Sequence, residues 1–452
     1  MSYTLINPTT EESMETIEHF SEAQADEAID RAQKAQLKWA ALSPGDRAML
    51  LRRFARRVDE DIETLAQLEV RNSGHPIDQA RYEAGNVRDV LDYYAGAPER
   101  LMGKQIPVAG GIAMTFHEPI GVVGMITPWN YPMPIAGWGF APALAAGNAV
   151  VLKPAEWTPL TSLRMAELGL EAGLPEHLFQ IVTGQGQVAG NRLVTNEKVG
   201  KIVFTGSTAV GKSIMRTAAD QIKRITLELG GKSANVIFDD ADIAKAAKAA
   251  PYAVFENAGQ DCCARSRILV QDTVFDKFMA ELEPAVAGVK VGDPSLTGTE
   301  VGPLVSKKHL DTVTSYLEGA EVAFRGTAPT GKGFFFAPTV VVAKSLQDRC
   351  MSEEIFGPVV TVYRFKDEAE AISIANATEY GLSGSIWTKD LARGIRVSRG
   401  IQSGNLSVNS HSSLRYHTPF GGMKQSGMGR ELGPDAPYHF TEEKVVFFNQ
   451  ED

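Results

Sequence analysis

The fold is decided by residues 121–152, which read GVVGMITPWNYPMPIAGWGFAPALAAGNAVVL. The apolar, β-branched runs Gly121–Ile126 and Ala149–Leu152 predict buried strands at the two ends of this stretch. Similar short runs follow at Phe179–Val182, Lys201–Phe204 and Ile225–Leu229, and helical or Gly-rich segments separate them. Strands that alternate with helices predict a parallel sheet with helices on both faces. Such a sheet binds ligands at the carboxyl ends of its strands.

A second alternating block begins after Gly230-Gly231 and predicts a second α/β unit. Its expected strands are Asn235–Phe238, Ile268–Val270, Thr339–Val342, Val359–Phe365, Gly384–Trp387 and Asn405–Val408, with helices at Ala241–Asn257, Val274–Ala287 and Glu368–Ala377.

The first hundred residues have helical apolar spacing. We expect one helix over Ala23–Ala40, a second that carries Met49 to Leu68 and ends at Asn72-Ser73-Gly74, and a third over Asp78–Tyr94. The charged residues of the third helix are typical of a solvated face.

Two segments fit neither block. Leu101–His117 is rich in Gly and β-branched residues, and the tail Thr441–Phe448 contains Val445-Val446-Phe447-Phe448. Both predict exposed strands, and an apolar edge strand favours aggregation unless it pairs with another chain. We therefore expect an oligomerisation element.

Bulk composition excludes several classes of protein. The chain has 452 residues, 45 Lys+Arg against 55 Asp+Glu, and a net charge of −10. Such a charge repels nucleic acid and anionic lipid, so we expect neither as a partner. Three cysteines are too few for a disulfide framework, which favours the cytoplasm. The eight histidines form no zinc-ligand pattern, and the amino terminus does not resemble a signal peptide, so we expect no metal and no membrane segment.

Three motifs carry candidate chemistry. Cys262 stands in NAGQDCCARSR, where a polar Gly-containing turn argues against simple core packing, although most buried cysteines are inert. Glu228 ends an apolar strand before two glycines, either as a functional carboxylate or as a surface residue. Asn130 follows a strand in TPWNYP, where its amide suits either an oxyanion or a turn.

The sequence signals for phosphate binding are weaker than these three motifs. Residues 204–212, FTGSTAVGK, follow a strand and open a helix, whose N–H groups attract pyrophosphate. Gly184-Gln185-Gly186 with Gly190 approaches the dinucleotide fingerprint, but such turns are common.

Together these motifs resemble the aldehyde dehydrogenase superfamily, in particular the aminobutyraldehyde dehydrogenases. The matching stretches are GQDCCARSR (259–267), ELGGK (228–232), PWNYP (128–132), EEIFGPV (353–359) and PFGGMKQSG (419–427), and the resemblance runs from about Asn7 to the C-terminus. It implies a Rossmann-like NAD-binding domain (1–100 and 120–230), an α/β catalytic domain (231–433) and a small β arm for a homodimer or homotetramer (101–119 and 434–452).

The resemblance also implies the residue roles. Cys262 would attack the aldehyde, Asn130 would hold the oxyanion, and Glu228 would activate the water that hydrolyses the thioester. The cofactor-binding residues would be Ile126, Thr127, Pro128, Trp129, Lys153, Glu156, Gly186, Gly206, Ser207, Glu354 and Phe356. Glu156 at the ribose 2′-OH would repel a 2′-phosphate, so we expect NAD over NADP.

The chain departs from the family in two places. Many relatives begin with about twenty more residues in a hairpin, which we expect to be missing here because the chain starts almost at Asn7-Pro8-Thr9-Thr10. Many also have Lys where this chain has Gly139, so a proton relay through that Lys and Glu431 does not carry over.

Substrate-lining residues are expected to be Tyr131, Trp138, Asp261, Cys263, Phe420 and the loop His411–His417. Two aromatic rings and Asp261 suit a cationic chain, which predicts an ω-aminoaldehyde, although Asp261 could equally cap a turn. Cys263 could pair with Cys262 or only line the pocket. The alternatives are a CoA-acylating aldehyde dehydrogenase, which would lack Glu228, and a non-catalytic member of the family, which would have no need of Cys262.

Overall fold

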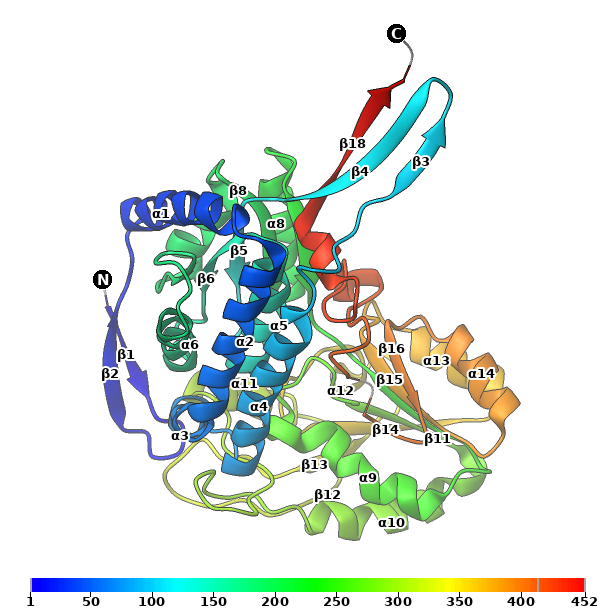
Figure 1. Cartoon of the computed structure of the whole chain (residues 1–452). Coiled ribbons are helices and arrows are strands. Elements are labelled where there is room, and N and C mark those ends of the chain that lie inside the picture. Colours follow the sequence, from blue (N-terminus) through cyan, green and yellow to red (C-terminus); the bar gives the residue numbers. More distant parts are fainter. Residues whose placement is uncertain (1, 413, 451–452) are drawn as a thin grey trace.

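Two mainly parallel sheets packed with helices form the body of the protein, and a narrow third sheet projects from it (Figure 1). The structure is a computed structural model that describes residues 2–412 and 414–450. This architecture confirms the predicted fold class of two α/β units with a small β arm. Within the described residues, no helix has the length and apolar character that a membrane span requires.

The first sheet has the strand order β17-β9-β8-β5-β6-β7, in which only β17 is antiparallel to its neighbour. Its strands are β5 (Val122–Ile126), β6 (Ala149–Lys153), β7 (Phe179–Ile181), β8 (Val199–Thr205), β9 (Arg224–Glu228) and β17 (Gly427–Met428). The connecting helices are α5 (Pro132–Ala145), α6 (Leu160–Glu171), η1 (Gly186–Gly190), α7 (Asn191–Thr195) and α8 (Thr208–Ala219). Strands β5 and β6 and helix α5 are buried along their whole length, which explains the uninterrupted apolar character of residues 121–152.

Four amino-terminal helices pack beside this sheet: α1 (Glu22–Ala40), α2 (Pro44–Glu60), α3 (Ile62–Ser73) and α4 (Ile77–Ala95). The prediction of a single helix through Leu68 was wrong, because the chain bends at Asp61. The Asp61 carboxylate accepts hydrogen bonds from Arg164 of α6 at 2.8 and 3.2 Å. This tertiary contact fixes the break, which apolar spacing cannot reveal.

The expectation that an amino-terminal hairpin is missing was wrong, because a hairpin opens the described chain. Strands β1 (Ser2–Ile6) and β2 (Ser13–Glu18) pair antiparallel on either side of the Asn7–Thr10 turn. Their alternation of exposed and half-buried residues is too weak a pattern to stand out in the sequence.

The second sheet has the order β12-β13-β14-β11-β10-β15-β16, and β12 alone is antiparallel. Its strands are β10 (Ala234–Ile237), β11 (Arg267–Gln271), β12 (Val322–Arg325), β13 (Thr339–Val342), β14 (Val359–Phe365), β15 (Ser383–Trp387) and β16 (Asn405–Val408). Its helices are α9 (Ile243–Phe255), η2 (Glu256–Gly259), η3 (Asp272–Val274), α10 (Phe275–Ala287), α11 (Lys307–Ser315), α12 (Arg349–Ser352), α13 (Glu368–Asn376) and α14 (Leu391–Gly400). The six strands predicted for this block are all present.

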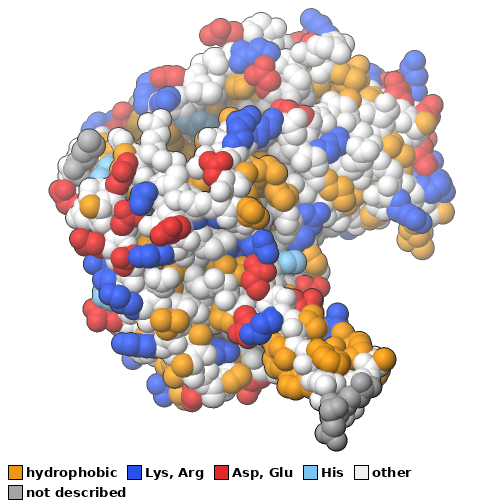
Figure 2. Space-filling view, turned by 90° about the horizontal axis from the view of Figure 1, so that it is seen from above, with side chains coloured by type: hydrophobic (Ala, Val, Ile, Leu, Met, Phe, Trp, Pro, Cys, Tyr) orange, Lys and Arg blue, Asp and Glu red, His pale blue; other side chains and the backbone are white. Residues whose placement is uncertain are grey.

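The projecting arm is a three-stranded antiparallel sheet in the order β18-β4-β3. It joins β3 (Gln105–Val108) and β4 (Gly111–Pro119) to the carboxy-terminal β18 (Thr441–Asn449), which the short helices η4 (Lys424–Ser426) and η5 (Ala436–Phe440) precede. Apolar side chains gather on the arm (Figure 2), and Val445 and Phe447 are among its exposed residues. The two segments that the sequence singled out therefore lie side by side.

Candidate active site

A cavity of about 750 Å³ opens at the carboxyl ends of the first sheet's strands. Three predicted cofactor residues line it: Ile126 at the end of β5, Glu156 after β6, and Gly186. A Cβ atom at Gly186 would meet nothing within 4 Å, so the backbone there is open to a ligand. This is the place where an open α/β sheet binds its ligand.

Other predicted cofactor residues lie around this cavity without lining it. Lys153, the last residue of β6, is buried, and burial lowers the pKa of its ammonium group. Ser207 caps α8 by accepting a hydrogen bond from the Val210 N–H at 3.4 Å. Thr127, Pro128, Trp129 and Gly206 are likewise absent from the lining.

Sequence reasoning missed most of the remaining lining residues. They are Gln185, Gln187, Gly190, Asn191, Val194, Phe204, Ala209, Val210, Ser213, Ile214 and Thr217. Gln185 and Gly190 belong to the Gly-rich turn, and Phe204, Ala209 and Val210 belong to the stretch 204–212, both of which the sequence had marked for phosphate binding. The other lining residues lie on helices η1, α7 and α8, and nothing in their residue types marks them.

Glu354 is held against the backbone of the ELGGK segment. The Gly231 N–H donates a hydrogen bond to Glu354 Oε1 at 2.8 Å. A Cβ atom at Gly230 would lie 2.4 Å from Glu354 Oε2, so only glycine permits this approach. Burial raises the pKa of Glu354 to about 7.

Phe356 and Trp129 meet across the two sheets. Their ring centroids are 5.3 Å apart and the rings are nearly perpendicular, as aromatic pairs prefer. Phe356 has a φ of 57°, and its carbonyl is 2.7 Å from His309 Nε2. This contact places two predicted cofactor residues from distant parts of the chain beside each other.

The nucleophile loop is interlocked with the Asn130 loop. Asn257 Nδ2 donates to the Asn130 carbonyl at 2.7 Å, and Asn130 Nδ2 donates to the Gln260 carbonyl at 2.9 Å. Asn257 and Ala258 both have positive φ, which lets the chain turn sharply after α9. One amide N–H of Asn130 is therefore engaged by the backbone, and an amide has a second N–H for an oxyanion.

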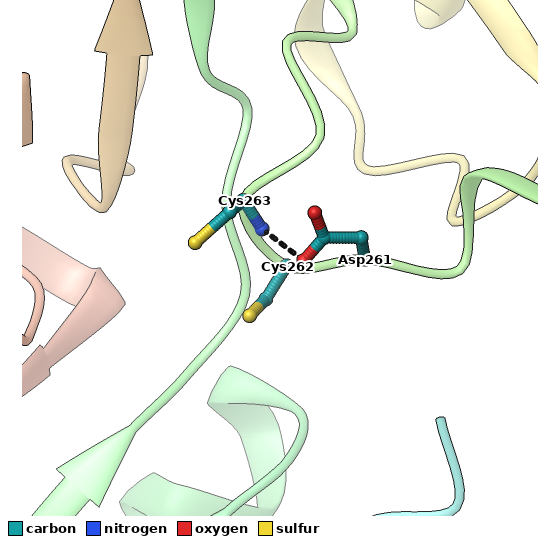
Figure 3. A group of neighbouring side chains, drawn as sticks. All are labelled: Asp261, Cys262 and Cys263. Atoms are coloured by element: carbon teal, nitrogen blue, oxygen red, sulfur yellow. Dashed lines mark hydrogen bonds between the residues drawn. The ribbon is translucent and has the colours of Figure 1, made fainter. Parts of the chain in front are cut away.

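Cys262 and Cys263 are neighbouring free thiols, with no disulfide between them (Figure 3). The Asp261 carboxylate accepts a hydrogen bond from the Cys263 N–H at 2.8 Å, which is the turn-capping role considered for it. The Cys263 thiol, burial and the Asp261 charge together raise the pKa of Cys262 well above its usual value. At neutral pH the Cys262 thiol is therefore protonated and needs a base or a ligand-induced change to react.

A second cavity, of about 190 Å³, opens over Cys262. Five of the predicted substrate residues line it, namely Tyr131, Trp138, Asp261, Cys263 and Phe420, together with His411, Ser412, Leu414 and Arg415 of the predicted loop. Tyr416 and His417 of that loop do not line it, and Ser413 lies outside the described residues. Cys262 and most of the expected substrate residues thus share one pocket.

The same pocket contains two carboxylates that the sequence reading missed. Glu83 comes from α4 and Glu256 from the end of α9. The reading of α4 as a solvated face was wrong for Glu83, which is buried. Burial and the nearby Asp261 raise the pKa of Glu256 to about 8, while its hydrogen bond from Tyr252 lowers it. Helical charge patterning alone cannot distinguish a pocket carboxylate from a surface one.

Glu228 ends β9 and is only 3% exposed. Among the described residues, neither of its carboxylate oxygens has a hydrogen-bond partner. Burial first, and then the charge of Glu431, raise the pKa of Glu228 well above its usual value, and the Cys263 thiol adds to this. The side chain does not line the 190 Å³ cavity but packs on the adjoining turn, where a Cβ atom at Gly421 would lie 2.6 Å from Glu228 Oε1.

A Cβ atom at Gly139 of α5 would lie 2.0 Å from Met125 Cε, the end of a flexible side chain on β5, so a larger residue here would require Met125 to move.

Comparison with known proteins decides the family. The aldehyde dehydrogenase family profile matches residues 1–446. The chain belongs to the aldehyde dehydrogenase family. It is 40% identical to an aldehyde dehydrogenase of Emericella nidulans over 100% of this chain and 92% of the relative. It is also 40% identical to the betaine aldehyde dehydrogenase of Bacillus subtilis, over 98% and 94% of the two chains.

Solved structures agree with this assignment. A putative aldehyde dehydrogenase from Burkholderia cenocepacia superposes with a TM-score of 0.97 at 41% identity, over 99% of this chain and 94% of the other. The betaine aldehyde dehydrogenase of Staphylococcus aureus, solved in complex with NAD+, gives 0.97 at 36% identity over 100% and 92%. This aldehyde dehydrogenase is therefore an oxidoreductase acting on an aldehyde group.

Proposed function

We propose that this aldehyde dehydrogenase uses NAD and releases a free carboxylic acid by hydrolysis of a thioester on Cys262. The observation that carries the proposal is the placement of the Cys262 thiol in the lining of a pocket, with the buried carboxylate of Glu228 near the adjacent Cys263. A CoA-acylating enzyme has no use for a carboxylate that activates water.

The residues supply the following chemistry. The Cys262 thiol gives its proton to a water molecule as Sγ attacks the carbonyl carbon, and the second amide N–H of Asn130 and the Cys262 backbone N–H hold the oxyanion that forms. NAD, when bound, accepts the hydride from the reacting carbon. Glu228 then takes a proton from a water molecule, whose oxygen attacks the thioester carbon. The carbon–sulfur bond breaks, the acid leaves, and Cys262 is regenerated.

The test is NADH absorbance with purified protein, NAD and a panel of aldehydes, each with and without CoA. We expect NADH and free acid without CoA. NADH that forms only with CoA would contradict hydrolysis, and no NADH with any aldehyde would contradict the proposed activity.

The 750 Å³ cavity fits a dinucleotide. It offers the Glu156 carboxylate for ribose hydroxyls and the open backbone at Gly186 for a close approach. The Glu156 carboxylate lies close enough to Lys153 to oppose the lowering of the Lys153 pKa by burial. This proximity supports a joint action of the two side chains on one ribose.

Cofactor preference depends on Glu156, which would meet a 2′-phosphate as a like charge. We expect kcat/KM for NAD to exceed that for NADP by at least about 100-fold, and Glu156→Gln to reduce the ratio by about tenfold or more. Steady-state kinetics with both cofactors measures this. A wild-type preference for NADP, or an unchanged ratio in the variant, would contradict the role of Glu156.

The substrate we propose is an aldehyde with a cationic group, such as an ω-aminoaldehyde. The pocket over Cys262 gathers the carboxylates of Glu83, Glu256 and Asp261 with several aromatic rings, a combination that suits an ammonium ion. Arg265 and Arg415 also line the pocket, but their guanidinium groups donate to backbone carbonyls and serine hydroxyls. A bound cation would lower the raised pKa of Glu256 and promote its ionisation.

Matched aldehydes test this substrate class. We expect Glu256→Gln and Asp261→Asn each to raise KM for 4-aminobutyraldehyde about tenfold, because each variant loses one charge-assisted contact with the ammonium group. Both variants should leave KM for butyraldehyde nearly unchanged. Betaine aldehyde serves as a second cationic substrate. Equal effects on the charged and the neutral aldehyde would contradict an ammonium site.

Assembly with further copies of this chain is proposed through the arm. The exposed apolar residues of the arm are Ile106, Val108, Met114, Phe116, Val445, Phe447 and Phe448, and β18 and β3 are its edge strands. An edge of this kind is protected when it pairs with another chain. Light scattering should show a dimer or tetramer that Val445→Asp with Phe447→Asp reduces to smaller species. A monomeric wild type would contradict the proposal.

A further inference from the structure

Three buried titratable side chains form a cluster beside the pocket over Cys262, and the proposed chemistry at Cys262 does not use them, although Glu83 also lines the pocket. Glu69 of α3 and His75, in the turn before α4, are each 1% exposed, and Glu83 of α4 is 2% exposed. Their potential ligand atoms all lie within 4.8 Å of one another. A cluster of this kind is costly to bury unless its charges are compensated.

His75 is held by Glu83. Its Nδ1 is 2.9 and 3.0 Å from the two Glu83 carboxylate oxygens, so that nitrogen carries a proton and donates it to Glu83. The Glu69 carboxylate lies nearby and accepts a hydrogen bond from Ser73 Oγ at 2.6 Å. Two carboxylates therefore surround one imidazole in a dry site.

The other side of His75 faces the active site. Its ring meets the Tyr131 ring edge-on, with centroids 5.4 Å apart. The backbone of Asn130 lies near enough to favour the charged form of the imidazole and so to raise its pKa. His75 thus connects the Glu83 carboxylate to the Asn130-Tyr131 segment.

We propose that His75, charged and held by Glu83, is a positioning residue that fixes the Asn130-Tyr131 segment beside Cys262. The inference rests on the proposed oxyanion role of Asn130. Asn130 is already held on two sides, through its carbonyl by Asn257 and through its amide by Gln260. His75, in the turn between α3 and α4, adds a ring contact to the next residue, Tyr131. A small displacement of an oxyanion donor has a large effect on the reaction rate.

The charge balance supports an imidazolium. Burial alone would lower the pKa of His75, but the charge and hydrogen bond of Glu83, the charge of Glu69 and the Asn130 backbone raise it to about 9. Glu256 and the Tyr131 phenol also face this group, and their pKa values respond to His75 and Glu83 respectively. His75 is therefore charged at neutral pH and loses its proton as the pH rises through about 9.

A metal ion is the competing occupant of this cluster. A protonated nitrogen cannot ligate a metal, so the two states exclude each other. Elemental analysis of the purified protein distinguishes them: we expect no stoichiometric transition metal, and one bound equivalent that Glu83→Gln removes would overturn the proposal.

The charge of His75 is measured by NMR titration of ¹³C-labelled histidine, assigned with His75→Gln. We expect a pKa of about 9, and a value near or below 6.5 would overturn the proposal. This measurement requires no turnover, so it is independent of whether the proposed activity is correct.

The positioning role is tested by His75→Gln, with His177→Gln at an exposed site as the matched control. We expect kcat/KM for an aldehyde to fall about 10- to 100-fold in His75→Gln, with unchanged NAD affinity. The wild-type loss of activity above pH 9 should disappear in the variant. Hydrogen–deuterium exchange of the peptide containing Asn130 should become faster in His75→Gln and not in the control.

If His75→Gln does not fold, Glu83→Gln provides the second test. Removing the counter-charge should move the alkaline limit of the activity profile from about pH 9 toward neutral pH. An unchanged alkaline limit in Glu83→Gln, or wild-type kinetics and exchange in a folded His75→Gln, would overturn the proposal.

Discussion

Replacing Cys262 with alanine is expected to lower aldehyde-dependent NADH formation by about 10⁴- to 10⁶-fold, because the variant has no nucleophile. The Cys262 thiol lines the pocket that also contains the predicted substrate residues. No neighbouring thiol can replace it without moving the reacting carbon away from the Asn130 amide. Stopped-flow and steady-state NADH absorbance measure the loss.

Cys350→Ala is the matched control for this variant. Cys350 is a buried free thiol in α12, and its Sγ donates to the Tyr316 carbonyl at 3.1 Å. It lines neither the 750 Å³ cavity nor the pocket over Cys262. We expect near wild-type rates in the control and unchanged NAD affinity in both variants. Residual turnover above about 1% of wild type in Cys262→Ala would contradict the role of this thiol.

Replacing Glu228 with glutamine is expected to lower kcat about 10²- to 10⁴-fold, the usual contribution of a general base. Acylation of Cys262 should persist, so a burst of about one NADH per active site should precede the slow steady state. Loss of the burst together with kcat would show that Glu228 is needed before hydrolysis.

The acid limb of the wild-type pH profile follows from the raised pKa of Glu228. Glu228 acts as a base after losing its proton, so kcat should rise as the pH rises through this pKa. Glu431→Gln is an informative companion variant, because the Glu431 charge is one cause of the raised Glu228 pKa. It should move the acid limb to lower pH, and a shift to higher pH would contradict this coupling.

The sequence predicted the parts of the fold that depend on local pattern. Central strands such as β5, β6 and β10 are buried along their whole length and are therefore rich in apolar residues, a signal that requires no tertiary information. The helix break at Asp61 could not be predicted, because it depends on Arg164, more than a hundred residues away.

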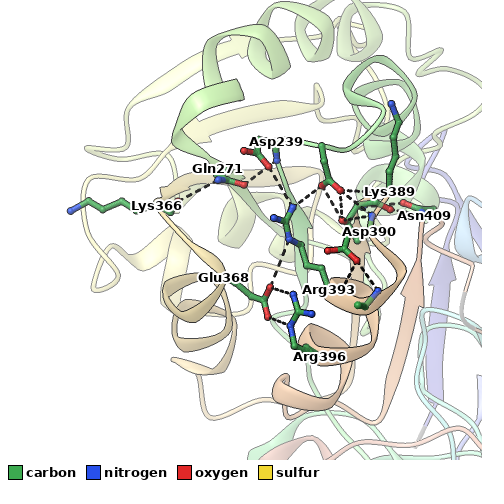
Figure 4. Close-up of polar contacts among 12 residues, drawn as sticks. Asp239, Gln271, Lys366, Glu368, Lys389, Asp390, Arg393, Arg396 and Asn409 are labelled. Carbon is green, nitrogen blue, oxygen red and sulfur yellow. Dashed lines mark hydrogen bonds and ion pairs between the residues drawn. The ribbon is translucent and has the colours of Figure 1, made fainter.

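Polar contacts between segments that are distant in the sequence could not be predicted either. The Asp240 carboxylate after β10 accepts hydrogen bonds from Thr388, from backbone N–H groups after β15 and from Arg393 of α14. About 150 residues of sequence separate Asp240 from these hydrogen-bond donors. The same Arg393 also pairs with Asp239 and Glu368 (Figure 4). Residue type alone marks such an aspartate as an ordinary surface charge.

For the site, the motifs contain most of the residues that the sequence had proposed for the pocket over Cys262, whereas only three of the predicted cofactor residues line the larger cavity. Cys262, Asp261 and Tyr131 lie together because their motifs directly follow strands or helices that meet at one edge. Glu83 and His75 were missed because their functional surroundings come from α3, α4 and the Asn130 loop together. Charged residues at helical spacing are usually solvated, and only the packing of α4 against α5 buries Glu83.

The most direct test of a covalent thioester on Cys262 is the mass of the Glu228→Gln protein after brief reaction with NAD and an aldehyde. We predict a modified peptide that contains Cys262, with an added mass equal to the aldehyde minus two hydrogen atoms, which hydroxylamine removes as expected for a thioester. An unmodified protein, or an adduct on Cys263 alone, from an enzyme whose wild type produces acid would contradict the account.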